Sequence, residues 1–137
     1  MGGAEIKVEK IGEYEFHVEM IPPAKGFPLA MKLTQVIGTI AGGDMSKALS
    51  SLSSDDIAEM TTIFAAYSKV KTPAGNLVPV KDMQDVLFAG KYGLMFKWLL
   101  LCTEANFGSF LGDLQGLAND LGTRLNRMFG KANSPNM

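Results

Sequence analysis

The spacing of apolar residues changes along the chain, and each spacing predicts a different kind of element. Apolar side chains alternate with charged or polar ones over residues 14–20, at Tyr14, Phe16, Val18 and Met20. Alternation with a period of two is typical of a β-strand with one buried face. Residues 5–11 show a similar pattern, and a Gly-Glu pair separates the two segments. The sequence therefore predicts an antiparallel β-hairpin near its beginning.

After two consecutive prolines, the apolar residues of 24–41 follow a helical spacing. This stripe consists of Leu29, Leu33, Val36, Ile37 and Ile40. Residues three or four positions apart lie on one face of an α-helix, so the segment predicts an amphipathic helix. Pro28 fits a helix only in its first turn, so we expect the regular helix to begin near Phe27. Two glycines at 42–43 end it, and a short helical piece is expected around 46–49.

Residues 53–69 carry the signals of a further helix. Ser53 can cap the N-terminus, because Asp56 stands at the third helical position and Leu52 and Ile57 stand at the two hydrophobic-staple positions. An apolar stripe follows at helical spacing, made of Ile57, Met60, Phe64 and Tyr67. We expect this helix to end near Lys69.

Residues 70–80 predict a second, smaller hairpin. Two short apolar arms flank the turn at 73–76, where glycine and asparagine accept a positive φ. The tip of this hairpin is either a functional loop or a plain connector between helices, and the connector is the simpler interpretation. Asp82 is then expected to be the N-cap of a short helix at 83–89, which breaks at Gly90 or Gly93.

The last third of the chain predicts two helices. An almost wholly apolar helix spans 92–105, and Asn106 marks a break before a final amphipathic helix that starts at Phe107. Residues 131–137 are expected to form a disordered tail after a single domain at 1–130. The fold class is therefore α+β and mostly helical. An N-terminal β-hairpin is followed by four or five packed helices, with a small second hairpin near 70–80.

The charge of the chain and the length of its apolar runs argue against nucleic acid and membranes as partners. The chain has 137 residues, of which 20% are charged, and a formal net charge of −1. Such a charge gives no electrostatic footprint for nucleic acid or an anionic membrane. No run of about 20 apolar residues predicts a membrane span, and the first residues lack the apolar run of a signal peptide. We expect a cytoplasmic protein that binds neither nucleic acid nor membrane.

Few residues are available for catalysis. The chain has one histidine, His17, in a predicted strand, and one cysteine, Cys102, in an apolar run. A structural zinc site usually takes four protein ligands, and the sequence has no glycine motif for nucleotides. A single histidine in a strand also has no Ser-His-acid arrangement around it. We expect no catalytic residue, no metal and no cofactor.

Half of the aromatic side chains lie between residues 86 and 111, at Phe88, Tyr92, Phe96, Trp98, Phe107 and Phe110. This segment is either the core of a helical domain or a surface that meets another hydrophobic chain. The nine methionines leave the same two alternatives open. Methionine fills irregular gaps in cores and also adapts to varied apolar partners.

Two regions of the chain resemble the phage tail assembly chaperones. YEFHVEMIPPAKGFPLAMKL at 14–33 is similar to the start of these proteins, where a strand leads through a proline turn into a helix. LVPVKDMQDVLFAGKYGLMFKWLLLCTEANFGSFL at 77–111 resembles their second signature, with an F-A-G-K break and a final N-F pair. The regions cover about half of the chain. The doubled proline and the Gly-Phe-Pro step after it depart from the family pattern.

The resemblance implies a non-enzymatic chaperone in the cytoplasm of the host bacterium. Such proteins bind and solubilise the long, helical tape measure protein before the tail tube forms around it. Many also exist as a longer, frameshifted product that recruits tail tube subunits, and self-association is a further expectation. The expected client surface comprises Phe88, Tyr92, Met95, Phe96, Phe107 and Phe110.

Two other functions stay open at this stage. One is a small structural or completion protein of the phage tail, which would remain in the virion. The other is a small enzyme or ligand-binding domain that uses an apolar pocket.

Overall fold

The structure is a computed structural model that describes residues 4–37 and 45–133. Four strands form one antiparallel sheet in the order β1-β2-β3-β4. The strands are β1 (Glu5–Ile11), β2 (Tyr14–Glu19), β3 (Ser68–Lys71) and β4 (Leu77–Pro79). Both predicted hairpins are confirmed, and pairing between β2 and β3 joins them into a single sheet. The mostly helical α+β class is also confirmed.

The two strands of the first hairpin differ in burial. Phe16 and Val18 of β2 are fully buried, as their alternation predicts, whereas Val8 of β1 is 44% exposed. The register places Lys7 and Glu9 of β1 opposite Val18 and Phe16, and an irregularity between Glu5 and Lys7 shifts the pairing. Val8 pairs with His17 and therefore lies on the face of the sheet opposite to that of Phe16 and Val18. Met20 is also exposed, since it follows the last residue of β2.

Helix α1 (Pro23–Ile37) begins earlier than predicted. The N–H groups of Lys25 and Gly26 already donate to the carbonyl of Pro22, and Pro28 lies inside the helix rather than in its first turn. Pro28 is exposed and has no N–H, so it donates no helical hydrogen bond to the carbonyl of Ala24. Gly26 of α1 is closely packed against Ile21 and Phe107. A Cβ atom at this position would stand 3.3 Å from Ile21 Cγ2 and 3.6 Å from a ring carbon of Phe107. The predicted end of α1, at 42–43, lies outside the described residues.

Helices α2 (Met45–Ser50) and α3 (Ser54–Ala66) follow, and the predicted cap of α3 is confirmed. Ser53 Oγ accepts a hydrogen bond from the backbone N–H of Asp56 at 3.1 Å. Lys32 links α1 to α3, since its ammonium lies 3.1 Å from a carboxylate oxygen of Asp56 and 2.6 Å from one of Glu59. Helix α3 ends at Ala66, before the predicted Lys69, because Ser68 and Lys69 pair with β2.

The segment after β4 corrects the predicted cap at Asp82. A 3₁₀ turn, η2 (Val80–Asp82), contains this residue, and the short helix α4 (Gln84–Leu87) has Met83 at its N-cap without a side-chain hydrogen bond. Asp82 is therefore used inside a turn and cannot cap the next helix. The predicted break at Gly90 is found, where a φ of 71° reverses the chain direction.

The predicted break at Asn106 is wrong, because α5 (Tyr92–Asn133) is one continuous helix. The Asn106 amide stays in the helix and binds the end of β2. Its Oδ1 accepts from the N–H of Ile21 at 2.9 Å, and its Nδ2 donates to the carbonyls of Glu19 and Cys102 at 3.3 Å. Asparagine costs a helix only a few tenths of a kcal/mol relative to alanine, which these bonds offset.

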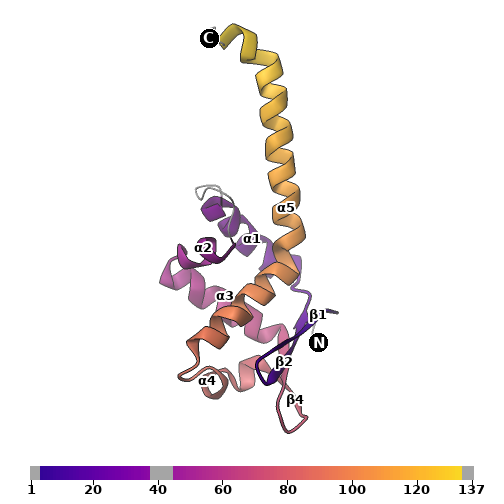
Figure 1. Cartoon of the computed structure of the whole chain (residues 1–137), viewed down its shortest axis with the longest axis vertical. Helices are drawn as coiled ribbons and strands as arrows, with labels where there is room; N and C mark the ends of the chain where they lie inside the picture. The colour runs from indigo at the N-terminus through magenta and orange to yellow at the C-terminus, as the bar shows by residue number, and fades with distance from the viewer. Residues whose placement is uncertain (1–3, 38–44, 134–137) are drawn as a thin grey trace. The chain divides into compact units, whose positions relative to one another are not determined.

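The described chain divides into two compact units, Met1–Phe107 and Gly108–Met137, and α5 contributes to both. Figure 1 shows the elements of the first unit, with the strands near the bottom of the view and α1 to α3 above them. The predicted disordered tail at 131–137 is wrong at its start, because residues 131–133 belong to α5, and residues 134–137 lie outside the described residues. Among the described residues, the helices are too short or too polar for any of them to cross a membrane.

The core of the first unit is built around Trp98, whose side chain is fully buried. Its ring lies 6.4 Å from that of Phe64 in an edge-on arrangement and 5.0 Å from that of Phe88. Phe107 extends the cluster to the other side of Phe64, at 6.2 Å. The indole N–H of Trp98 donates to Ser68 Oγ at 3.3 Å, which satisfies the one polar atom of the indole. Much of the aromatic segment is therefore core.

Candidate functional site

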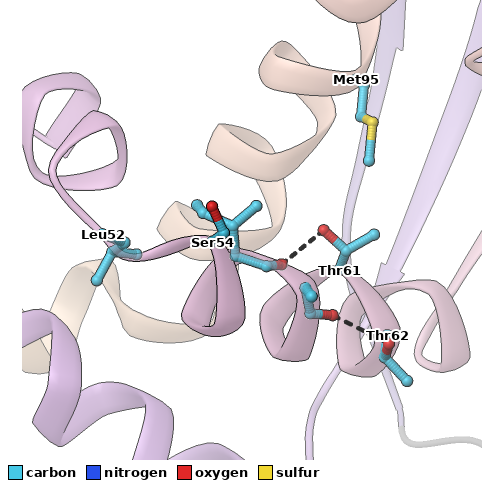
Figure 2. A pocket seen from close by; sticks show the side chains of 7 residues that line it. Leu52, Ser54, Thr61, Thr62 and Met95 are labelled. Atoms are coloured by element: carbon cyan, nitrogen blue, oxygen red, sulfur yellow. Dashed lines mark hydrogen bonds between the residues drawn. The ribbon is translucent and has the colours of Figure 1, made fainter.

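An open groove lies between α3 and the start of α5 in the first unit. Its volume is about 510 Å³. Seven side chains line it: Leu52, Ser54, Ile57, Ala58, Thr61, Thr62 and Met95. Figure 2 shows Met95 reaching from α5 toward the side of α3 that carries Thr61. The groove is thus formed by one face of α3, by Leu52 just before this helix and by a single flexible side chain from α5.

The lining of the groove carries no ionisable side chain. Its two threonine hydroxyls bond to their own helix, Thr61 to the carbonyl of Ile57 at 2.8 Å and Thr62 to that of Ala58 at 3.0 Å (Figure 2). Both hydroxyl protons are therefore already donated within α3. The groove therefore favours an apolar partner over a polar or charged ligand.

The structure separates the six residues that the sequence proposed as a client surface. Tyr92 is 75% exposed, whereas Met95 and Phe96 are partly exposed on the same first turns of α5. Phe88 and Phe107 are almost completely buried and belong to the aromatic core. Their side chains are covered in the folded chain, so we leave them out of the surface.

Phe110, the sixth residue of that set, lies in the second unit and is partly exposed. The groove residues on α3 were not part of the predicted surface, because Ile57 was assigned to the buried stripe of that helix. A signal for them was present in the run of small side chains at Ala58, Thr61 and Thr62. Small residues on one helix face allow close approach of another chain.

A second depression of about 400 Å³ lies between the end of β1 and α5. Side chains of both signs line it, with Glu9 and Lys10 on the strand side and Lys97 and Glu104 on the helix side. Opposite charges alternate around this surface, so it offers no field of a single sign to attract a charged ligand.

The single cysteine does not have the surroundings of a nucleophile. Cys102 is fully buried, and this burial raises the pKa of its thiol far above the ordinary value, although a hydrogen bond with Ser68 acts in the opposite direction. The thiol form is inert as a nucleophile and as a metal ligand. Within the described residues, His, Cys, Asp and Glu form no group of three or more that could hold a metal ion.

The single histidine has two carboxylate partners on the face of the sheet. His17 Nδ1 lies 2.5 Å from Glu5 Oε2, and Nε2 lies 2.7 Å from Glu15 Oε2. Burial by itself lowers the pKa of His17, but the hydrogen bonds and the charges of both glutamates outweigh it and raise the pKa above 6.5. When it is protonated, His17 can donate to both glutamates and thereby connect β2 to Glu5 of β1.

We expect this bridge to make the hairpin sensitive to pH. A pKa raised by folding means that His17 stabilises the folded chain fully below pH 6.5, and that this contribution is lost as the pH rises through the raised pKa. Because the chain has one histidine, an NMR titration reports it without ambiguity. Glu5→Gln and Glu15→Gln are expected to lower the measured pKa, whereas Glu9→Gln serves as the control. A wild-type pKa at or below 6.5 would contradict the bridge.

Comparison with known proteins identifies no relative. No protein-family model, curated protein sequence or solved structure matches the chain.

Proposed function

We propose that this chain is a non-enzymatic bacteriophage tail assembly chaperone that binds the tape measure protein. The observation that carries the proposal is the open apolar groove between α3 and α5, which contains Met95 and lacks ionisable side chains. An amphipathic helix binds such a groove by laying its apolar face into it. A tape measure protein is long and helical, and presents the apolar stripe that this mode of binding needs.

The residues around the groove suit a helical client. Ala58 and Thr61 are small, so the backbone of a bound helix can approach α3 closely. Met95 has three rotatable bonds in its side chain and adapts to irregular apolar surfaces along a repetitive client. Tyr92 and Phe96 lie one helical turn from each other, which adds aromatic surface beside Met95.

The proposed client surface is therefore narrower than the one predicted from the sequence. It consists of Tyr92, Met95 and Phe96 on α5 together with the groove residues Ile57 and Ala58 on α3. Phe88 and Phe107 are core residues instead. Phe88 packs against Trp98, and Phe107 packs against Phe64. Phe110 stays a predicted contact from the second unit.

The cellular setting follows from the client. The tape measure protein is made in the cytoplasm of the infected bacterium, and its exposed apolar stripe favours aggregation until the tube covers it. A chaperone that covers the stripe keeps it soluble. A longer, frameshifted form of the same chain would add the segment that recruits tail tube subunits.

Co-expression tests this proposal. The tape measure protein encoded in the same phage genome is produced with and without this chain, and its soluble fraction is measured after affinity purification. We expect it to become soluble and to co-purify only when the chain is present. An insoluble tape measure protein under both conditions would contradict the proposal. Detection of the chain in purified, complete virions would instead favour a structural protein of the tail.

A further inference from the structure

Within the part of the chain that the structure describes, strand β1 has no partner strand on one side of its backbone. It stands at the edge of the four-stranded sheet and pairs with β2 on one side only. Most of its residues are exposed, including Val8 at 44%. An exposed edge strand of this length presents a row of free N–H and C=O groups that can pair with another strand.

The hairpin register determines which of these backbone groups point outward. Ile11 and Tyr14 flank a two-residue turn, so they form the hydrogen-bonded pair that closes the hairpin. Hydrogen-bonded and non-hydrogen-bonded pairs alternate along antiparallel strands. Glu9 and Lys7 therefore direct their backbone groups toward β2, and Val8 and Lys10 direct theirs away from the sheet.

The charges of β1 are self-complementary about Val8. We propose that β1 pairs with β1 of a second copy of this chain, antiparallel, with Val8 opposite Val8 of the second copy. In this register Lys7 lies opposite Glu9 of the second copy, and Glu9 lies opposite Lys7. The Lys7 and Glu9 side chains are both half-exposed, at 50% each, and 3.9 Å apart in one chain, so they are available for these two new ion pairs.

The two neighbouring antiparallel registers place like charges together. A shift of two residues toward the N-terminus sets Lys7 against Lys7, and a shift in the other direction sets Glu9 against Glu9. A parallel, in-register pairing would place every charge opposite itself. Like charges directly opposite each other destabilise a strand pair, and opposite charges stabilise it. Among the antiparallel registers that pair at least five residues of each β1, the charge pattern therefore selects one arrangement, in which the same strand forms both sides of a two-fold symmetric interface.

The proposed pairing joins two sheets into one continuous sheet and covers the exposed Val8 of each copy. It does not use α3 or the start of α5, so it does not depend on the proposed function. A contact made by one strand from each copy is small, and we therefore expect a weak dimer whose population rises with protein concentration.

Sedimentation equilibrium of the full chain over a concentration series tests the pairing. Lys7→Glu and Glu9→Lys, each alone, turn both ion pairs into like-charge pairs and are expected to weaken the dimer about tenfold. The double variant that exchanges the two charges restores association. An equimolar mixture of the two single variants also restores it, because each strand then meets a strand of opposite charge. A misfolded single variant would not be rescued by mixing.

Val8→Pro supplies a second, independent test. Proline removes the outward N–H of Val8, whereas the bonds to β2 stay in place, because an edge strand accepts proline where its N–H faces solvent. We expect a folded monomer with an unchanged circular dichroism spectrum. A wild-type chain that stays monomeric at its highest soluble concentration overturns the proposal. So does a dimer that survives Val8→Pro or ignores the charge of residues 7 and 9.

Discussion

Replacing Trp98 by alanine is expected to destabilise the folded chain by about 3–5 kcal/mol, the cost of truncating a large buried aromatic residue. The side chain is fully buried, contacts Phe64 and Phe88 and donates its indole N–H to Ser68. Alanine would remove all of these contacts and leave a cavity between α5 and β3. A domain of this size has a free energy of unfolding of about 5–15 kcal/mol. The loss is thus a large share of the total.

Urea denaturation followed by circular dichroism measures this effect. The matched control is Tyr92→Ala, because Tyr92 begins the same helix, is also aromatic and is 75% exposed. We expect the control to change the free energy of unfolding by no more than about 0.5 kcal/mol. Equal effects of the two substitutions would contradict the assignment of Trp98 to the core and Tyr92 to the surface.

Local patterns in the sequence predicted the local elements well. The alternation around Phe16 identified β2, and the Ser53 cap identified the start of α3. Both signals act between residues close in the sequence, so the sequence displays them directly. The pairing of β2 with β3 has no such signal, because it joins residues about fifty positions apart. The single four-stranded sheet was therefore not predictable from the pattern.

Asn106 shows why the helix boundaries near it were harder to predict. Asparagine often stands at helix ends, where its amide bonds to the backbone. In this chain the same bonding capacity is directed at Ile21 and Glu19, which lie far away in the sequence. A residue typical of a helix end thus stabilises the middle of a helix. Only the tertiary structure distinguishes these two uses.

The candidate site was predictable only in part. Met95 lies in the groove, and Tyr92 is exposed, as a client surface requires. Phe88 and Phe107 have the same apolar character but are buried, since Phe88 packs against Trp98 and Phe107 lies close to Gly26 of α1. Hydrophobic character alone does not distinguish core from surface in a segment this rich in aromatic residues.

Blocking the groove is expected to abolish client binding without unfolding the chain. Ala58 lines the groove from an exposed position on α3, so Ala58→Arg would place a long, charged side chain where an apolar helix face would bind. Arginine is a good helix former, and the helix should persist. The matched control is Ala66→Arg, at the exposed last residue of the same helix and outside the groove.

The measurement is the affinity of the purified chain for a helical segment of the tape measure protein, by fluorescence anisotropy, for the wild type and both variants. We predict that Ala58→Arg weakens binding at least about tenfold, or about 1.4 kcal/mol, whereas Ala66→Arg binds like the wild type. Equal binding by all three proteins, or no binding by the wild type, would contradict the claim that this groove holds the tape measure protein.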